Sequence, residues 1–355
     1  MWRLLLGLIV VTSCSSSPDA AFQPPASPPV ASPTPARSGV LAAVSGPDDV
    51  IRLMGSDGAV VASAPSAPAR YRQNFLMPWF SATQTRVYFL YGGSDVRYLT
   101  PRGETGSITR VTLAPNQQAG ISVSPDDRRI AVAILNYTPP PGSQTVVNPP
   151  TYDGMRLYVE DLHGGGHHAD IFASTEVAEF PIGWINGRLV MAVSSPVCCQ
   201  LLAINPYGAT SYHVIDPANG VRLADLCPNS LGPVGPVEPI GTACWEDHAE
   251  PRYQRWDGSP FPTPTAMTSP FQYLNALSPD GTRVAAGGAQ IRILRGGQGD
   301  DQLGEGGFVY GWLDDSHLIY EPVGGTIRAF DLFTRTSVAL DRSYYYLGVF
   351  PAAIS

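Results

Sequence analysis

Short apolar strands separated by tight turns are the main pattern of the chain after residue 37. Six segments share the plan of an apolar strand, a turn and a second apolar strand: 75–91, 120–135, 181–193, 273–288, 309–321 and, truncated, 346–353. Ser278-Pro279-Asp280-Gly281 has the residues that a type I turn prefers. Asn186-Gly187 is a strong signal for a hairpin. The pattern therefore predicts antiparallel hairpins.

Third and fourth strands follow many of these hairpins. Examples are 95–100 with 107–113, 211–216 with 221–226, and 326–331 with 336–340. Four antiparallel strands in a unit of about 40 residues, repeated along the chain, are typical of a β-propeller. First strands are expected near residues 77, 121, 182, 242, 275, 310 and 347. This spacing predicts seven blades, of which the one near residue 242 is poorly formed.

The two ends of the domain complement each other. Segments 39–45, 50–54 and 59–64 supply second, third and fourth strands without a first, whereas 346–353 supplies a first strand without partners. One blade built from both ends would close the ring and remove an open edge. We therefore expect an all-β fold, a seven-bladed β-propeller in which the C-terminal strand joins the N-terminal blade. A pair of β-sandwiches is the alternative.

Two segments resemble the repeat of TolB-type propellers, which are relatives of the WD-repeat group. They are SPDDRRIAVAIL (124–135) and SPDGTRVAAGG (278–288). Segments 184–193 and 312–321 match more loosely. The resemblance implies the propeller fold. The repeat is a structural signature without a catalytic residue, so it implies no activity.

The first 37 residues have a different composition. Residues 4–11 form an apolar run that follows Arg3, as in a secretory signal, and the run is far shorter than the roughly 20 residues that cross a bilayer. Val11-Thr12-Ser13-Cys14 resembles a bacterial lipobox, which implies that Cys14 is lipidated and becomes the first mature residue. An ordinary signal peptide with an incidental cysteine is the alternative.

A Pro/Ser/Ala-rich segment follows Cys14 up to residue 37, and such a composition is typical of an extended, disordered tether. We expect a signal peptide at 1–13, a tether at 14–37 and the propeller domain at 38–355. The protein would then be exported and lipid-anchored through Cys14 to the cell membrane or outer membrane, on the extracytoplasmic side.

The charge of the chain limits its partners. The formal net charge is -8, and the sequence has no cluster of five or more basic residues. Nucleic-acid binding needs a basic surface, so nucleic acid is not an expected partner. An electrostatic attachment to anionic lipid is disfavoured for the same reason.

Four cysteines besides Cys14 suggest disulfides in an exported domain: Cys198, Cys199, Cys227 and Cys244. Three pairings are formally possible. A bond between the adjacent Cys198 and Cys199 would be strained, so we expect each of them to pair with Cys227 or Cys244. A metal site is a weaker alternative, because no CxxC spacing occurs and the expected compartment is oxidising. Free thiols are the remaining alternative.

Three insertions interrupt the repeat, at 136–153, 194–209 and 227–268. Loops carry function more often than strands do, so we expect them to line one face of the propeller. The third insertion contributes the aromatic candidates for a binding face, Trp245, Tyr253, Trp256 and Phe261. The alternative is that these insertions pack down over imperfect blades.

Sites for a metal or a cofactor are weakly supported. His163, His167 and His168 lie near Asp161 and Asp170, and imidazoles beside carboxylates can bind a divalent ion. Asp300, Asp301 and Glu305 offer oxygen ligands but lack the spacing of a calcium loop. A solvated turn is the favoured interpretation of both groups. We therefore predict no metal site and no cofactor.

Catalysis has no sequence signature, and we assign no catalytic residue. No GxSxG motif occurs. One acidic group near aromatic residues would suit a sugar: Glu246, Asp247, Glu250 and Asp257. The sequence favours a binding or scaffolding module for a protein, peptide or glycan partner. The alternative is an envelope hydrolase or lyase with carboxylates at the mouth of the propeller channel.

Overall fold

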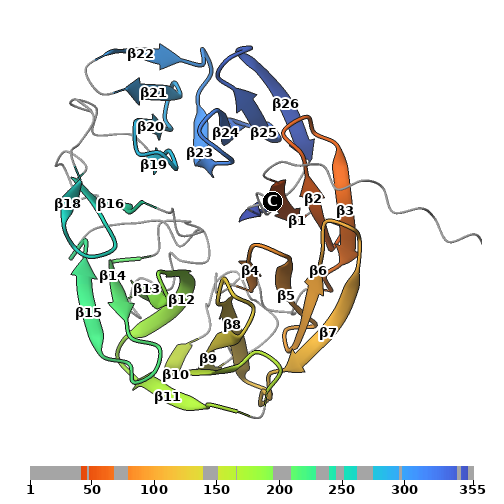
Figure 1. Ribbon diagram of the computed structural model, residues 1–355, viewed down its shortest axis with the longest axis vertical. Coiled ribbons are helices and arrows are strands. Elements are labelled where there is room, and N and C mark those ends of the chain that lie inside the picture. The colour runs from red at the N-terminus through yellow and green to blue at the C-terminus, as the bar shows by residue number, and fades with distance from the viewer. Residues whose placement is uncertain are drawn as a thin grey trace, which may run out of the picture. The chain divides into compact units, whose positions relative to one another are not determined.

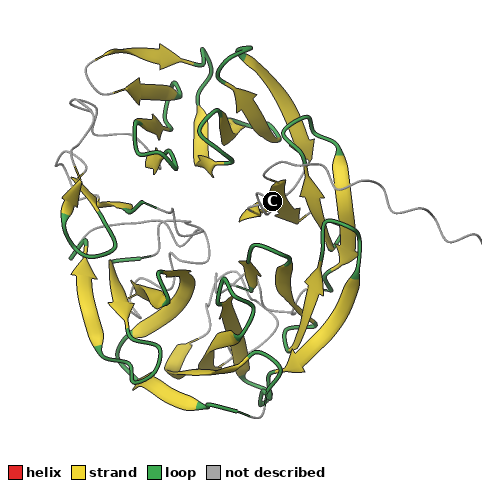
Figure 2. Cartoon of the chain, in the orientation of Figure 1, coloured by secondary structure: helices red, strands yellow, loops and turns green. Residues whose placement is uncertain are grey.

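The structure is a computed structural model that describes eleven parts of the chain: 41–45, 48–67, 79–138, 151–164, 166–194, 209–228, 240–244, 252–261, 275–295, 298–341 and 345–350. Contacts divide the chain into two units, Met1–Pro35 and Ala36–Ser355. The fold described below is that of the second unit. Its described residues form β-strands and loops, without a helix (Figure 2).

Antiparallel sheets follow one another around a ring (Figure 1). Six of them have four strands, and each forms a blade. Three blades come from the first part of the domain and the two chain ends: β27 (Tyr345–Phe350), β1 (Leu41–Ser45), β2 (Val50–Met54) and β3 (Val60–Pro65); β4 (Phe80–Ala82), β5 (Val87–Tyr91), β6 (Asp95–Leu99) and β7 (Thr105–Arg110); β8 (Gln117–Val123), β9 (Arg129–Thr138), β10 (Thr151–Asp161) and β11 (Ala169–Ser174).

The other three blades have the same strand order: β12 (Ala178–Ile185), β13 (Arg188–Ser194), β14 (Ser211–Ile215) and β15 (Arg222–Leu226); β19 (Asn275–Leu277), β20 (Arg283–Ala286), β21 (Arg292–Arg295) and β22 (Gln298–Gln302); β23 (Gly307–Trp312), β24 (His317–Pro322), β25 (Ile327–Asp331) and β26 (Thr336–Asp341). In every blade the first strand lies nearest the centre of the ring (Figure 1).

The expectation of seven blades is wrong, because the structure has six complete blades. Between β15 and β19 lies a short three-stranded sheet of β16 (Thr242–Cys244), β17 (Arg252–Gln254) and β18 (Pro260–Phe261). The described residues include no fourth strand for this sheet. The sequence offers a physical reason for the shortness of β18, because Pro260 within it and Pro262 directly after it lack the N–H group that a ladder hydrogen bond requires.

The two chain ends join in one blade. β27 pairs antiparallel with β1, from Leu41 opposite Phe350 to Ser45 opposite Tyr345, with one register shift between Ala43 and Val44. All of β1 is buried. This pairing was expected from the missing strands at each end of the domain, and it leaves β1 without an open edge.

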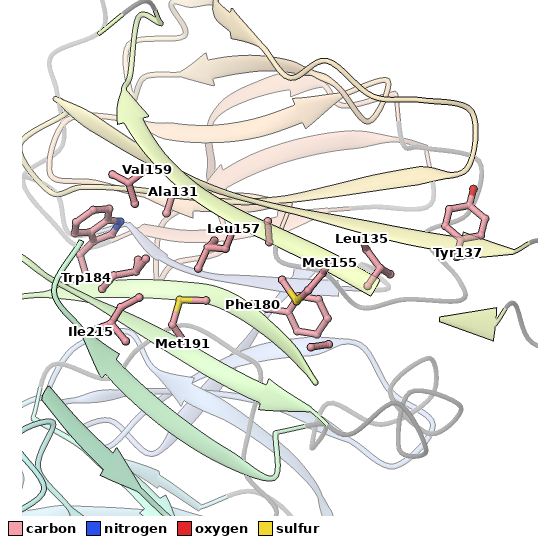
Figure 3. Close-up of a cluster of buried hydrophobic side chains, with 13 residues drawn as sticks. Ala131, Leu135, Tyr137, Met155, Leu157, Val159, Phe180, Trp184, Met191 and Ile215 are labelled. Carbon is pink, nitrogen blue, oxygen red and sulfur yellow. The ribbon is translucent and has the colours of Figure 1, made fainter. Parts of the chain in front are cut away.

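The core consists of apolar layers between neighbouring blades. Figure 3 shows the layer between blade β8–β11 and blade β12–β15, where Leu135 and Leu157 face Phe180 and Met191. A similar layer joins Tyr212 of β14 to Trp256, next to β17. Burial of one such side chain contributes about 1.5–3 kcal/mol. The layers therefore fix the blades relative to one another. They also fix the points at which the connections between strands begin and end.

Candidate functional site

The long connections of the domain leave from one end of the blades. In a four-stranded antiparallel blade, the chain enters the first strand and leaves the fourth strand at the same end of the blade. The links between blades and the links between second and third strands therefore lie at that end. This end carries four long connections, 66–79, 139–150, 195–210 and 227–241, and we call it the loop face. The opposite end, the turn face, has shorter links within the sheets, of which 162–168 and 245–251 are the longest. Connection 262–274 is an exception, because the three-stranded sheet β16–β18 ends at the turn face and β19 begins at the loop face.

The described residues at the roots of these connections are held firmly. The backbone N–H of Thr210 donates to the carbonyl of Val193 (2.7 Å) at the end of 195–210. The hydroxyl of Tyr152, after 139–150, donates to the carbonyls of Ser174 (3.0 Å) and Val177 (2.9 Å). Fixed roots lower the entropic cost of ordering a loop around a partner.

A disulfide joins Cys227 to Cys244 across 17 residues. Both cysteines are buried, and the backbone N–H of Cys227 donates to Oε1 of Gln254 (3.0 Å). The expectation that each of these cysteines pairs with Cys198 or Cys199 is therefore wrong. The reason is proximity, because β15 and β16 come from adjacent sheets. Cys198 and Cys199 lie outside the described residues. The bond fixes one root of connection 227–241.

A group of charged side chains lies in blade β12–β15, near the loop face. Nδ1 of His213 lies 3.1 Å from Oε1 of Glu179, and its Nε2 lies 3.4 Å from Oδ1 of Asp225. Arg222 lies 3.8 Å from Glu179 and 3.3 Å from Asp225. Glu179 and His213 are buried, whereas the side chains of Arg222 and Asp225 are half-exposed. We call these four residues the charged cluster.

The charged cluster was not predicted from the sequence. A usable signal was nevertheless present, because Glu179 interrupts the apolar run Ala178–Ile185 and His213 interrupts Ser211–Ile215. A charged residue within a buried strand persists only when it is paired. The partner of each residue was not visible, because β13 lies between the two strands that carry them.

The aromatic candidates for a binding face are interior residues where the structure describes them. Tyr253 is 2% exposed and Trp256 is 6% exposed. The Trp256 ring packs edge-on against Tyr212, with centroids 5.8 Å apart, and burial raises the pKa of the Tyr253 hydroxyl. This differs from the expectation, because adjacent sheets cover both rings. Trp245 and the side chain of Phe261 lie outside the described residues.

The histidine candidates lie on an exposed turn of the turn face. Nδ1 of His167 lies 3.0 Å from Asp161, and Nδ1 of His168 lies 3.1 Å from Glu160. His163 is exposed on the same turn. Nowhere in the described residues do three or more His, Cys, Asp or Glu side chains form a group that could hold a metal ion.

The acidic candidates for calcium are paired with arginines. Asp301 lies 3.1 Å from both Arg295 and Arg335, and Glu305 accepts a hydrogen bond from the Tyr320 hydroxyl. Because their oxygens contact cations and donors from the protein itself, the two acids serve as links between neighbouring blades. The side chain of Asp300 lies outside the described residues.

The acidic group proposed for a sugar is described only at Asp257. This exposed carboxylate accepts hydrogen bonds from the hydroxyl (2.6 Å) and the backbone N–H (2.8 Å) of Ser259. These bonds hold its pKa below the usual range. Glu246, Asp247 and Glu250 lie outside the described residues. Asp257 therefore stabilises a turn in the described structure.

Ser316, His317 and Asp314 have the composition of a catalytic triad but not its geometry. The Ser316 hydroxyl (3.1 Å) and Oδ1 of Asp314 (2.9 Å) both contact Nδ1 of His317. A triad needs the serine and the carboxylate on opposite ring nitrogens. Asp314 also accepts hydrogen bonds from the backbone N–H groups of Ser316 and His317. The three residues therefore stabilise the turn between β23 and β24.

No protein-family model matches the chain, and no curated protein matches its sequence. Solved structures do match. Dipeptidyl peptidase 4 from Porphyromonas gingivalis is 9% identical, with a TM-score of 0.50 over 88% of this chain and 60% of that chain. BamB from Moraxella catarrhalis is 13% identical, with a TM-score of 0.43 over 82% of this chain and 81% of that chain.

The C-terminal WD40 domain of Sif2 is 12% identical, with a TM-score of 0.39 over 72% of this chain and 70% of that chain. Identities this low concern the fold alone. This chain spans about three fifths of the peptidase, so that enzyme's activity does not transfer to it.

The described part of this chain contains no helix that could span a membrane. The sheet topology of the described residues is that of an all-β propeller domain, and the likeness to the peptidase concerns this fold.

Proposed function

We propose that this chain is a lipid-anchored interaction module of a bacterial cell envelope, and that its loop face binds a protein, peptide or glycan partner. The observation that carries the proposal is the unequal length of the connections on the two faces. Connections 66–79, 139–150, 195–210 and 227–241 all leave from the loop face. Binding residues are found disproportionately on loops that a rigid scaffold holds in place.

The scaffold beneath the loop face suits this role. The disulfide Cys227–Cys244 and the hydrogen bonds of Thr210 and Tyr152 hold loop roots in place. The blades behind them are joined by continuous apolar layers. The described roots of the connections are thus set before a partner binds, which reduces the entropic cost of association.

Site-specific photocrosslinking tests the binding role. A photoreactive residue replaces Glu176, which is exposed on the loop face, and a matched protein carries it at Glu104, which is exposed on the turn face. We expect an adduct of discrete mass in envelopes from the Glu176 position and none from Glu104. Adducts only from Glu104 would contradict the loop face. Turnover of a glycan or peptide library without any adduct would contradict the binding role and favour the hydrolase or lyase alternative.

The lipid anchor is supported by the resemblance of Val11–Cys14 to a lipobox and by the Pro-rich segment that follows. Its test is separate. Cys14→Ser should move the protein from the membrane fraction to the soluble exported fraction, because one acylated cysteine provides the membrane attachment. Ser15→Ala is the matched control and should stay with the membrane. If Cys14→Ser also stayed there, the anchor proposal would be wrong.

A further inference from the structure

The segment that carries Cys14 joins the domain at the turn face. β1 is the second strand of its blade, in the order β27-β1-β2-β3. Second strands run from the turn face to the loop face, because the links between first and second strands lie at the turn face. Leu41, where β1 begins, is therefore at the turn face. The chain that precedes Leu41 enters the domain from that side.

Two neighbouring blades expose apolar side chains at the turn face, and an apolar layer joins these blades. Phe333, in the turn between β25 and β26, is 83% exposed, and Val60, at the start of β3, is 53% exposed. The turn before β3 packs against β26, where a Cβ atom on Gly58 would lie 2.7 Å from a methyl group of the partly exposed Val338. We call Val60, Phe333 and Val338 the apolar rim.

Hydrogen bonds hold the turn that carries Phe333. The backbone N–H groups of Phe333 (2.7 Å) and Thr334 (3.2 Å) both donate to Oδ1 of Asp331. The N–H of Arg335 donates to the carbonyl of Asp331 (2.9 Å). A single exposed apolar residue is ordinary on a protein surface, but this turn keeps a whole phenyl ring away from the apolar layers, beside a second blade that also exposes an apolar side chain.

The charges of the two turns do not oppose contact with a bilayer. The turns contain one acid and one base, Asp57 and Arg335. Oδ1 of Asp57 accepts a hydrogen bond from the N–H of Ala59 (3.0 Å), and Arg335 lies 3.1 Å from Asp301. Because these charges balance, contact with lipid would depend on the apolar side chains rather than on electrostatic attraction.

We propose that the apolar rim rests in the surface of the bilayer to which Cys14 anchors the chain, so that the turn face meets lipid and the loop face points away from it. This inference rests on the proposed lipid anchor. Residues 14–40 reach at most about 90 Å when fully extended, so the length of this segment permits either orientation. Burial of one phenyl ring shifts the ratio of orientations by about tenfold to a hundredfold. That is enough to orient a tethered domain and leaves the loop face free for a partner.

Photocrosslinking to lipid tests the orientation. The full-length lipidated protein is placed in vesicles of isotopically labelled phosphatidylcholine, with a benzophenone side chain in place of Val60. A matched protein carries the same probe in place of Val323, which is 78% exposed in the loop-face turn between β24 and β25. We expect labelled adducts from position 60 to exceed those from position 323 by about tenfold or more.

Two substitutions identify the ring responsible. With the probe at Val60, Phe333→Ala should lower the yield of labelled adducts about tenfold, whereas Val323→Ala should leave it unchanged. Both side chains are exposed, so both variants should fold. Equal yields from the two probe positions, or an unchanged yield in Phe333→Ala, would overturn the proposal.

Flotation of the same vesicles separates this inference from the anchor on which it rests. If the protein does not float with the vesicles, the anchor at Cys14 is wrong and the orientation is wrong with it. If it floats but gives equal yields at the two positions, only the orientation is wrong. Vesicles of pure lipid contain no envelope partner, so neither result affects the photocrosslinking test of the loop face.

Discussion

At the scale of single residues, aspartates stabilise the turns between first and second strands. Oδ1 of Asp126 accepts from the Ser124 hydroxyl (2.6 Å), and Oδ1 of Asp280 accepts from the Ser278 hydroxyl (2.6 Å). Asp314 has the same role with Ser316. Short polar side chains that bond their own backbone are what such turns require. This explains why the Ser-Pro-Asp motifs in the sequence predicted these turns.

Asp314→Asn should destabilise the protein at neutral pH. Burial acts to raise the pKa of Asp314, but hydrogen bonds from Ser316 and His317 outweigh it and hold the pKa below its ordinary value. Such a carboxylate stabilises the fold above its unfolded-state pKa of about 3.9, and this contribution is lost as the pH falls through the folded-state pKa. The side chain is 37% exposed, so solvent screening lowers the effect.

We expect Asp314→Asn to cost about 1 kcal/mol in the free energy of unfolding at pH 7. The difference from the unmodified protein should shrink as the pH falls below about 4, because the unmodified carboxylate then loses its charge. Urea unfolding at several pH values measures both. Glu176→Gln, at an exposed position, is the control. A cost independent of pH would show that the charge of Asp314 has no role.

Trp256→Ala should act on stability, because the ring is buried against Tyr212. Removing a buried tryptophan side chain costs about 3–5 kcal/mol. Phe333→Ala is the control, since Phe333 is 83% exposed, and its effect should stay within about 0.5 kcal/mol. Thermal unfolding compares the two variants. Equal effects would contradict the interior position of Trp256.

At the scale of elements, the sequence predicts which strands form hairpins better than it predicts which sheets become neighbours. The strands around Asn186-Gly187 and Ser278–Gly281 are found where alternation and turn residues place them. The sheet β16–β18 was poorly specified, because short strands and prolines leave little periodicity. The disulfide partner of Cys227 and the burial of Trp256 depend on which sheets become neighbours. Local sequence does not contain that information.

The disulfide Cys227–Cys244 should stabilise the domain measurably. Closing a loop of about 15 residues restricts the unfolded chain by about 3 kcal/mol, and the bond here spans 17 residues. Cys227→Ser with Cys244→Ser should therefore lower the free energy of unfolding by about that amount. The prediction is checked by urea unfolding of the double variant beside the oxidised protein. Unchanged stability would mean that contacts of Gln254 and the apolar layer suffice to hold this sheet.

At the scale of the whole domain, closure was easier to predict than blade number. Complementary missing strands at the two ends required only a count of strands, and the β27–β1 pairing agrees with it. Blade number required each unit to complete its sheet. The unit near residue 242 lacks a clear alternation of apolar and polar residues. Its described strands form a three-stranded sheet.

Removal of β27 should open the ring. Residues 345–355 are deleted, which exposes the paired edge of β1 at Leu41–Ser45, where every residue is buried. An apolar open edge promotes pairing with other chains, so we expect loss of cooperative unfolding and self-association, measured by calorimetry and light scattering. A peptide of residues 345–355 added in trans should restore the monomer by pairing with β1, and a scrambled peptide should not. If the truncated protein stays monomeric with an unchanged melting temperature, closure through β27 contributes nothing to stability, and the apolar layers between blades hold the ring by themselves.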